Sequence, residues 1–315
     1  MQISLAQARR RARSAVLCAA ALFAACSGGE PIERFVAQRL IVLGDETSVL
    51  TGNGGKHSVN ALAADGVTLD CKANPLWVQI LAGLYGLTFA QCPNGNAPVT
   101  VQTFAAAGAQ VGGISAQVDS VGGFVEKDLV TLLVGANDIL AQYALIGAGT
   151  QTEAGAVAVL TAAGEALAGQ VNRIANTGGK VLISTVPDLG LTPFAIGQGT
   201  ANADLLTRLT REFNTRLRIN IINDGRRIGL LLTDELIQAV VRNPAGVGLV
   251  NVRDGVCVAG LGPTECTTLT LVPVPAPAAS ASASTYLWAN DRLFSAAGHS
   301  LLGNLALSRA TGNPF

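Results

Sequence analysis

The stretch "DLVTLLVGAND" (residues 128–138) constrains the fold of this chain more than any other segment. Up to Val134 it is an almost continuous apolar run, and the segment ends in the polar residues Asn137 and Asp138. A strand with this pattern is buried on both of its faces, as happens in a parallel sheet that carries helices on either side. The segment therefore predicts a central strand of an α/β sheet.

Strand and helix signals alternate along the rest of the chain, and this alternation predicts a parallel sheet with helices on both faces. A short helix is expected to end at Val241. The other predicted strands are 39–45, 99–105, 180–188 and 227–234, and the other predicted helices are 75–86, 152–176, 203–224 and 295–310.

The composition suits one large soluble domain, since 49% of the 315 residues are hydrophobic and 13% are charged. The formal net charge is zero, so nothing indicates a nucleic-acid partner, which would need a basic face. Two segments interrupt the alternation: a polar loop at 46–70 and a Pro/Ala/Ser-rich stretch at 271–285. We expect the second to be an extended loop inside a domain spanning 38–315, because a helix still follows it.

The N-terminus has the features of a targeting segment. Arg9–Arg13 is positively charged, and the run from Ala15 to Ala25 is apolar. This run is too short to span a bilayer as a permanent helix. We therefore expect residues 1–25 to be a signal peptide.

The signal peptide ends in "LFAACSGG", where small residues precede Cys26. This pattern resembles the lipobox of bacterial lipoproteins, in which the cysteine is diacylated after cleavage. The resemblance implies a membrane partner through a lipid anchor on Cys26 and a tether at 26–37. It places the protein in the bacterial cell envelope, facing the periplasm or at the outer membrane. An ordinary signal peptide cut near Ala25 is the alternative.

The cysteines indicate disulfide bonds. If Cys18 is removed with the signal peptide and Cys26 is lipidated, four cysteines remain, an even number that favours disulfides in an exported chain. Of the three pairings that four cysteines allow, closeness in sequence favours Cys71–Cys92 and Cys257–Cys266. The chain has no CxxC motif and no histidine cluster, so we expect no metal and no cofactor.

Three polar turns fall at the carboxyl ends of predicted strands, where ligands bind in open parallel sheets. They read "GDE" (44–46), "AAGAQ" (106–110) and "GAND" (135–138). Together with "LWANDRLFSAAGH" (287–299), they resemble the sequence blocks of the SGNH/GDSL hydrolase family of lipases and esterases. The resemblance covers roughly 38–310. It implies a three-layer α/β/α fold with a parallel, flavodoxin-like sheet, and hydrolysis of carboxylic esters.

The resemblance also assigns roles to individual positions. The oxyanion donors of the family fall on Gly108 and Asn137, which match its motif. Its nucleophilic serine falls on Glu46. Its Asp-x-x-His pair falls on Asn290 as the acid position and Leu293 as the base position.

These three substitutions indicate that ester hydrolysis is lost or weak. A carboxylate that attacks an ester forms an anhydride, which is uphill relative to an acyl-serine, and Glu46 would repel a developing oxyanion. Without a base, a nearby hydroxyl stays protonated near neutral pH. The members of a catalytic triad act as a unit, so their losses are not additive. We therefore expect a lipid-anchored family member that retains a cleft for an acyl-ester or glycan ligand.

Two other functions remain open. In the first, the protein is an active esterase that uses Ser48 or Thr47 with His57 as the base. In the second, it is a structural envelope lipoprotein without a ligand. The remaining histidine, His299, lies on the last predicted helix and is expected to be a packing residue.

Overall fold

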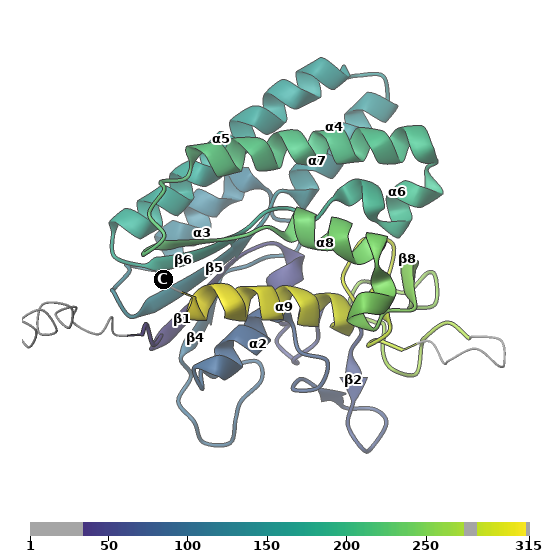
Figure 1. Cartoon of the computed structure of the whole chain (residues 1–315). Coiled ribbons are helices and arrows are strands. Elements are labelled where there is room, and N and C mark those ends of the chain that lie inside the picture. Colours follow the sequence, from purple (N-terminus) through teal and green to yellow (C-terminus); the bar gives the residue numbers. More distant parts are fainter. Residues whose placement is uncertain (1–33, 274–281, 313–315) are drawn as a thin grey trace, which may run out of the picture. The chain divides into compact units, whose positions relative to one another are not determined.

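A computed structural model of the chain describes residues 34–273 and 282–312 (Figure 1). The predicted signal peptide, Cys26 and most of the predicted tether lie outside these residues, as does 274–281 within the predicted 271–285 loop. Predictions about export and lipidation therefore stay predictions.

Five parallel strands form the central sheet. Their order across the sheet is β4-β1-β5-β6-β7, in which the second strand of this set lies at one edge and the first lies beside it. This is the 2-1-3-4-5 order of flavodoxin-like sheets, so the predicted fold class is confirmed. The strands are β1 (Arg39–Gly44), β4 (Val101–Thr103), β5 (Asp128–Leu133), β6 (Lys180–Ser184) and β7 (Ile228–Leu231).

Helices cover both faces of this sheet, as the alternating residues of its strands require. Ile41 and Leu43 of β1 belong to one core cluster, and Leu40 and Val42 belong to the other. Figure 1 shows the helices of the two layers on opposite sides of the strands. The first cluster packs against α3 (Ile114–Ser120), α4 (Ala136–Gly147), α5 (Glu153–Asn176), α6 (Pro193–Gly197) and α7 (Thr200–Asn220); the second packs against α2 (Trp77–Leu84), α8 (Thr233–Arg242) and α9 (Ala296–Thr311).

Helix α5 is long and apolar enough to cross a membrane by length and composition. In this fold its buried residues include Leu160, Leu167 and Val171, which belong to the core between α5 and the sheet. The apolar residues of α5 therefore pack against the sheet and α7.

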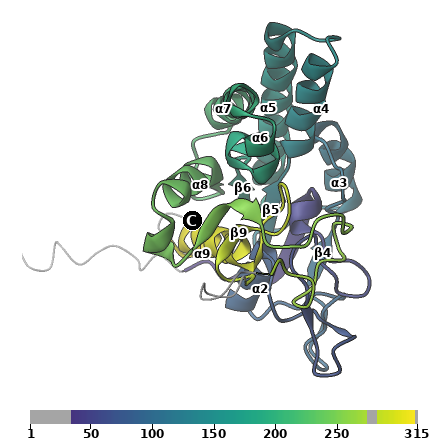
Figure 2. The ribbon, with the colours of Figure 1, turned by 90° about the vertical axis from the view of Figure 1, so that its right-hand side faces the viewer.

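The polar loop predicted at 46–70 has local structure of its own. It begins with a 3₁₀ turn, η1 (Glu46–Ser48), and contains β2 (Ala61–Leu62), which pairs with β3 (Leu69–Asp70). A second small sheet near the C-terminal part pairs β8 (Asn251–Gly255) with β9 (Tyr286–Trp288). Figure 2 shows β9 beside α9.

Both predicted disulfides are present. Cys71–Cys92 joins residues separated by 21 positions, and Cys257–Cys266 joins residues separated by 9. The first connects the segment after β3 to the loop that precedes β4. The second closes the loop that follows β8.

Candidate functional site

The site is built where β1 ends. Gly44, the last residue of β1, has a φ of 120°, and a Cβ atom there would lie 2.0 Å from the carbonyl oxygen of Leu133 on the neighbouring strand. Only glycine fits this turn. Asp45 then caps the 3₁₀ turn, because its Oδ1 accepts a hydrogen bond from the N–H of Thr47 at 3.0 Å. The turn directs Glu46 to the carboxyl end of the sheet.

Two loops bring hydrogen-bond donors to Glu46. The N–H of Gly108 donates to Oε2 of Glu46 at 2.9 Å, and Nδ2 of Asn137 donates to the same oxygen at 3.0 Å. Gly108 has a φ of 73°, a backbone conformation that favours glycine, and lies in the loop after β4. Asn137 lies in the first turn of α4, and its side chain also donates to the carbonyl of Ala109 at 3.1 Å.

The positions predicted as oxyanion donors therefore meet at one point, and the Glu46 carboxylate occupies that point. Donors about 3 Å from a negative oxygen are the arrangement that stabilises an oxyanion in acyl transfer. Here the negative oxygen belongs to the protein itself. Oε1, the other oxygen of Glu46, accepts no hydrogen bond from any residue within 34–273 or 282–312.

The hydroxyl groups beside Glu46, on Thr47 and Ser48, differ in their exposure to solvent. Ser48 is 0% exposed, and its Oγ accepts a hydrogen bond from the indole N–H of Trp77 at 3.1 Å. Its side chain is therefore part of the packing between η1 and α2. Thr47 is partly exposed, and its hydroxyl has no hydrogen-bond partner in the described part of the chain.

Titratable side chains gather around the turn. Burial, together with the negative charge of Glu46, raises the pKa of Asp45 to about 7. Burial also raises the pKa of Asp138, although the N–H of Val111 donates to its carboxylate and opposes that shift. These carboxyl groups were not singled out from the sequence, although Asp45 stands in the quoted turn and Asp138 ends the "GAND" motif.

His57 belongs to the same surroundings. Burial lowers its pKa, and the negative charge of Glu46 opposes this shift. The ring is partly exposed, but its Nδ1 is buried and has no hydrogen-bond partner within the described residues. His57 is therefore a neutral imidazole near neutral pH.

The acid and base positions of the family form a tight turn between β9 and α9. Oδ1 of Asn290 accepts hydrogen bonds from the backbone N–H groups of Arg292 and Leu293, at 3.1 and 2.9 Å. Leu293 is buried. No hydrogen bond joins either position to Glu46, so Asn290 serves the local turn and Leu293 the packing.

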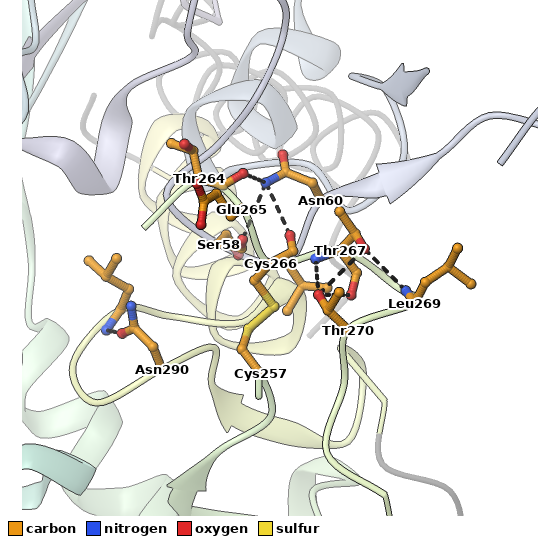
Figure 3. The surroundings of a disulfide bond; sticks show 12 residues. Ser58, Asn60, Cys257, Thr264, Glu265, Cys266, Thr267, Leu269, Thr270 and Asn290 are labelled. Atoms are coloured by element: carbon orange, nitrogen blue, oxygen red, sulfur yellow. Dashed lines mark hydrogen bonds between the residues drawn. A yellow bond between two sulfur atoms is a disulfide. The ribbon is translucent and has the colours of Figure 1, made fainter. Parts of the chain in front are cut away.

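A pocket of about 510 Å³ lies beside this turn. Figure 3 shows the surroundings of the Cys257–Cys266 disulfide, including Ser58 and Asn290, which line this pocket. Asn60 holds the disulfide loop, because its Nδ2 donates to the carbonyls of Thr264 and Cys266 at 3.0 and 3.2 Å. The lining includes polar groups of Ser58, Asn290 and Asp291 and apolar side chains of Val258, Leu261 and Val272.

His299 lies inside the protein, away from solvent. It is 0% exposed, and its Nδ1 accepts a hydrogen bond from the backbone N–H of Trp77 at 3.4 Å. Burial, together with the nearby positive charge of Lys56, lowers its pKa to about 3. A histidine in this setting joins α9 to the start of α2, which matches the packing role expected from the sequence.

Comparison with known proteins shows the family to which the chain belongs. A model described as GDSL-like Lipase/Acylhydrolase matches residues 40–240, so the chain belongs to this family. No curated protein sequence matches the chain.

Solved structures with a similar fold have low sequence identity to this chain. Axe2, an acetylxylan esterase from Geobacillus stearothermophilus, is 13% identical, with a TM-score of 0.47, over 90% of this chain and 98% of that chain. LAE5, described as an alpha/beta hydrolase enzyme from the metagenome of Lake Arreo, Spain, is 16% identical, with a TM-score of 0.43, over 88% and 96%. TesA is 14% identical, with a TM-score of 0.40, over 86% and 97%.

Proposed function

We propose that this protein is an exported, lipid-anchored member of the GDSL family that has lost serine-dependent ester hydrolysis and binds an acyl-ester or glycan ligand. One observation carries the loss of hydrolysis. Oε2 of Glu46 accepts hydrogen bonds from both oxyanion donors, the Gly108 N–H at 2.9 Å and the Asn137 amide at 3.0 Å. The carbonyl oxygen of a bound ester would have to displace this carboxylate before either donor could stabilise it.

The ligand-binding part of the proposal rests on the pocket beside the Asn290 turn. Its volume of about 510 Å³ suits a small organic ligand. Asn290 and Asp291 offer polar groups, and Val258, Leu261 and Val272 offer apolar surface. This mixture fits a ligand that carries both hydroxyl and acyl groups.

In the active-esterase alternative, Ser48 is a less suitable nucleophile than Thr47. Ser48 is fully buried and already bonded to Trp77, so an ester could reach its hydroxyl only after local unpacking. Thr47 and His57 are both partly exposed, and no hydrogen bond joins them. We keep this alternative as an outcome of the test below.

The test is to rebuild the family's catalytic residues. Purified wild-type protein should show no turnover of short and long acyl esters above background, and Glu46→Ser alone should not restore turnover, because the family's base position still holds Leu293. The triple variant Glu46→Ser, Asn290→Asp, Leu293→His frees the oxyanion donors and supplies acid and base. We expect it to hydrolyse a short activated ester measurably faster than the wild type, in a continuous absorbance assay.

The matched control is the same triple variant with Glu46→Ala in place of Glu46→Ser, which lacks only the nucleophile. Circular dichroism must first show that each variant is folded, because Leu293 is buried and histidine there is polar and differs in shape. Wild-type turnover abolished by Thr47→Ala or His57→Ala would support the active-esterase alternative. A folded triple variant without activity would favour the structural role over the ligand-binding role.

A further inference from the structure

We propose that Glu46 is a nucleophile towards saturated carbon, and that the protein hydrolyses small alkyl halides through an alkyl ester of Glu46. The geometry points to this activity because the two carboxylate oxygens are unequal. Oε2 accepts hydrogen bonds from both oxyanion donors, whereas Oε1 accepts none from the described residues. The proposal goes beyond the proposed function and does not rest on its ligand.

The chemistry differs from that of an ester substrate. A carboxylate that attacks an ester carbonyl gives a high-energy anhydride, but a carboxylate that attacks a saturated carbon gives an ordinary ester. Carboxylate side chains are established nucleophiles in covalent catalysis. Glu46 is partly exposed, so a small electrophile can approach Oε1 from solvent.

The first step needs no proton. A lone pair of Oε1 forms a bond to the carbon of the alkyl halide while the carbon–halogen bond breaks, and the bonding pair leaves with the halide. The negative charge of Glu46 is thereby transferred to the halide ion. Oε2 becomes the carbonyl oxygen of the new glutamyl ester, and it already lies 2.9 Å from the Gly108 nitrogen and 3.0 Å from Nδ2 of Asn137.

The second step regenerates the carboxylate. A water molecule attacks Cδ of Glu46 and gives its proton to His57, while the negative charge that develops on Oε2 is stabilised by the two donors. The tetrahedral intermediate then collapses, and the bond between Cδ and Oε1 breaks. Oε1 leaves as the oxygen of the alcohol and takes the proton back from His57. The sum is alkyl halide plus water giving alcohol, halide ion and one proton.

His57 is suited to this role by its surroundings. The imidazole is partly buried in the loop after η1, and its Nδ1 has no hydrogen-bond partner among the described residues. The mechanism places the attacking water between His57 and Glu46, where the negative charge of Glu46 favours the protonated imidazole. Free esters do not reach the oxyanion donors, but an ester formed on Glu46 is already placed there.

The test uses 1-bromobutane and water labelled with heavy oxygen. The mechanism sends Oε1 into the alcohol and a water oxygen into Glu46. A single turnover should therefore give butanol with ordinary oxygen and a Glu46 peptide with heavy oxygen, both read by mass spectrometry. Bromide release should be lost in Glu46→Gln, which keeps an oxygen for both donors. Glu165→Gln, an exposed carboxylate on α5, is the matched control and should release bromide as the wild type does.

His57→Gln separates the two steps. It should retain alkylation of Glu46 but slow the release of butanol by roughly 10²-fold, so that the butyl ester accumulates on the Glu46 peptide. Heavy oxygen in the butanol, or bromide release that is equal in wild type and Glu46→Gln, would overturn the proposal. A negative ester assay with a positive bromide assay would support both proposals. The absence of both ester turnover and bromide release would sink this proposal alone, whereas ester turnover without bromide release would sink both.

Discussion

Asp45 stabilises the turn after β1, but its carboxyl group is buried, and ionising a buried carboxyl group costs free energy. It is 1% exposed, its Oδ1 is used to cap η1, and its buried Oδ2 has no hydrogen-bond partner within the described residues. Burial, with the charge of Glu46, raises its pKa from 3.8 to about 7. The folded protein therefore binds this proton more tightly than the unfolded chain does.

The sign of the pH dependence follows from the raised pKa. The stability contributed by protonated Asp45 is fully present below about pH 4 and is lost as the pH rises through about 7. Asp45→Asn removes the ionisation and keeps the oxygen that caps η1. We expect the stability of the variant relative to wild type to increase by about 1–3 kcal/mol between pH 5 and pH 8. Urea denaturation at both pH values measures this, and a difference that does not change with pH would contradict it.

The sequence was informative about some residues of the site and silent about others. Gly108 and Asn137 could be placed because their motifs resemble the family's sequence blocks, and the structure brings both to Glu46. The contact of Oε2 with both donors could not be predicted, because it depends on the side-chain conformation of Glu46. Ser48 was kept as an alternative nucleophile from its place after the turn, but it is buried and bonded to Trp77, which lies 29 positions further along the chain.

Among the elements, the strands of the central sheet were the most predictable because their burial gives continuous apolar runs. The prediction for 180–188 was too long, since β6 ends at Ser184 and the chain leaves the sheet there. Helices α3, α4 and α6 were not predicted, and neither were β8 and β9. The two strands are short, and β9 pairs with a partner more than thirty positions away in sequence, so only the tertiary structure reveals them.

The two disulfides close loops of different length, and this difference permits a prediction about how much each disulfide contributes to stability. Replacing both cysteines of a pair by serine should lower the free energy of unfolding by about 2–4 kcal/mol in the chain-entropy model. Because Cys71–Cys92 closes the longer loop, its loss should cost about 0.5–1 kcal/mol more than the loss of Cys257–Cys266. Denaturant titration of the two double variants compares them, after peptide mapping without reduction has established the pairing. The reverse order of stabilities would argue against loop entropy as the cause.

For the whole molecule, the prediction concerns its place in the cell. Two or more acyl chains on Cys26 would hold the protein firmly on a membrane surface, whereas a protein without them would be soluble after cleavage. Cys26→Ser should therefore move the protein from the membrane fraction to the soluble periplasmic fraction, as followed by immunoblotting of separated fractions. Ser27→Ala, which leaves the cysteine in place, is the control. Identical partition of Cys26→Ser and wild type would favour an ordinary signal peptide.

The contact between Glu46 and the two oxyanion donors has a consequence for inhibition. Hydrolysis of an ester leaves a carboxylate at the nucleophile, and that carboxylate must depart before the next substrate binds. In this chain a carboxylate is attached to the site by its own backbone, where its effective concentration far exceeds that of a free fatty acid or acetate. The two donors are thus occupied as they would be by a retained carboxylate product, and free carboxylates should not bind there until Glu46 is shortened.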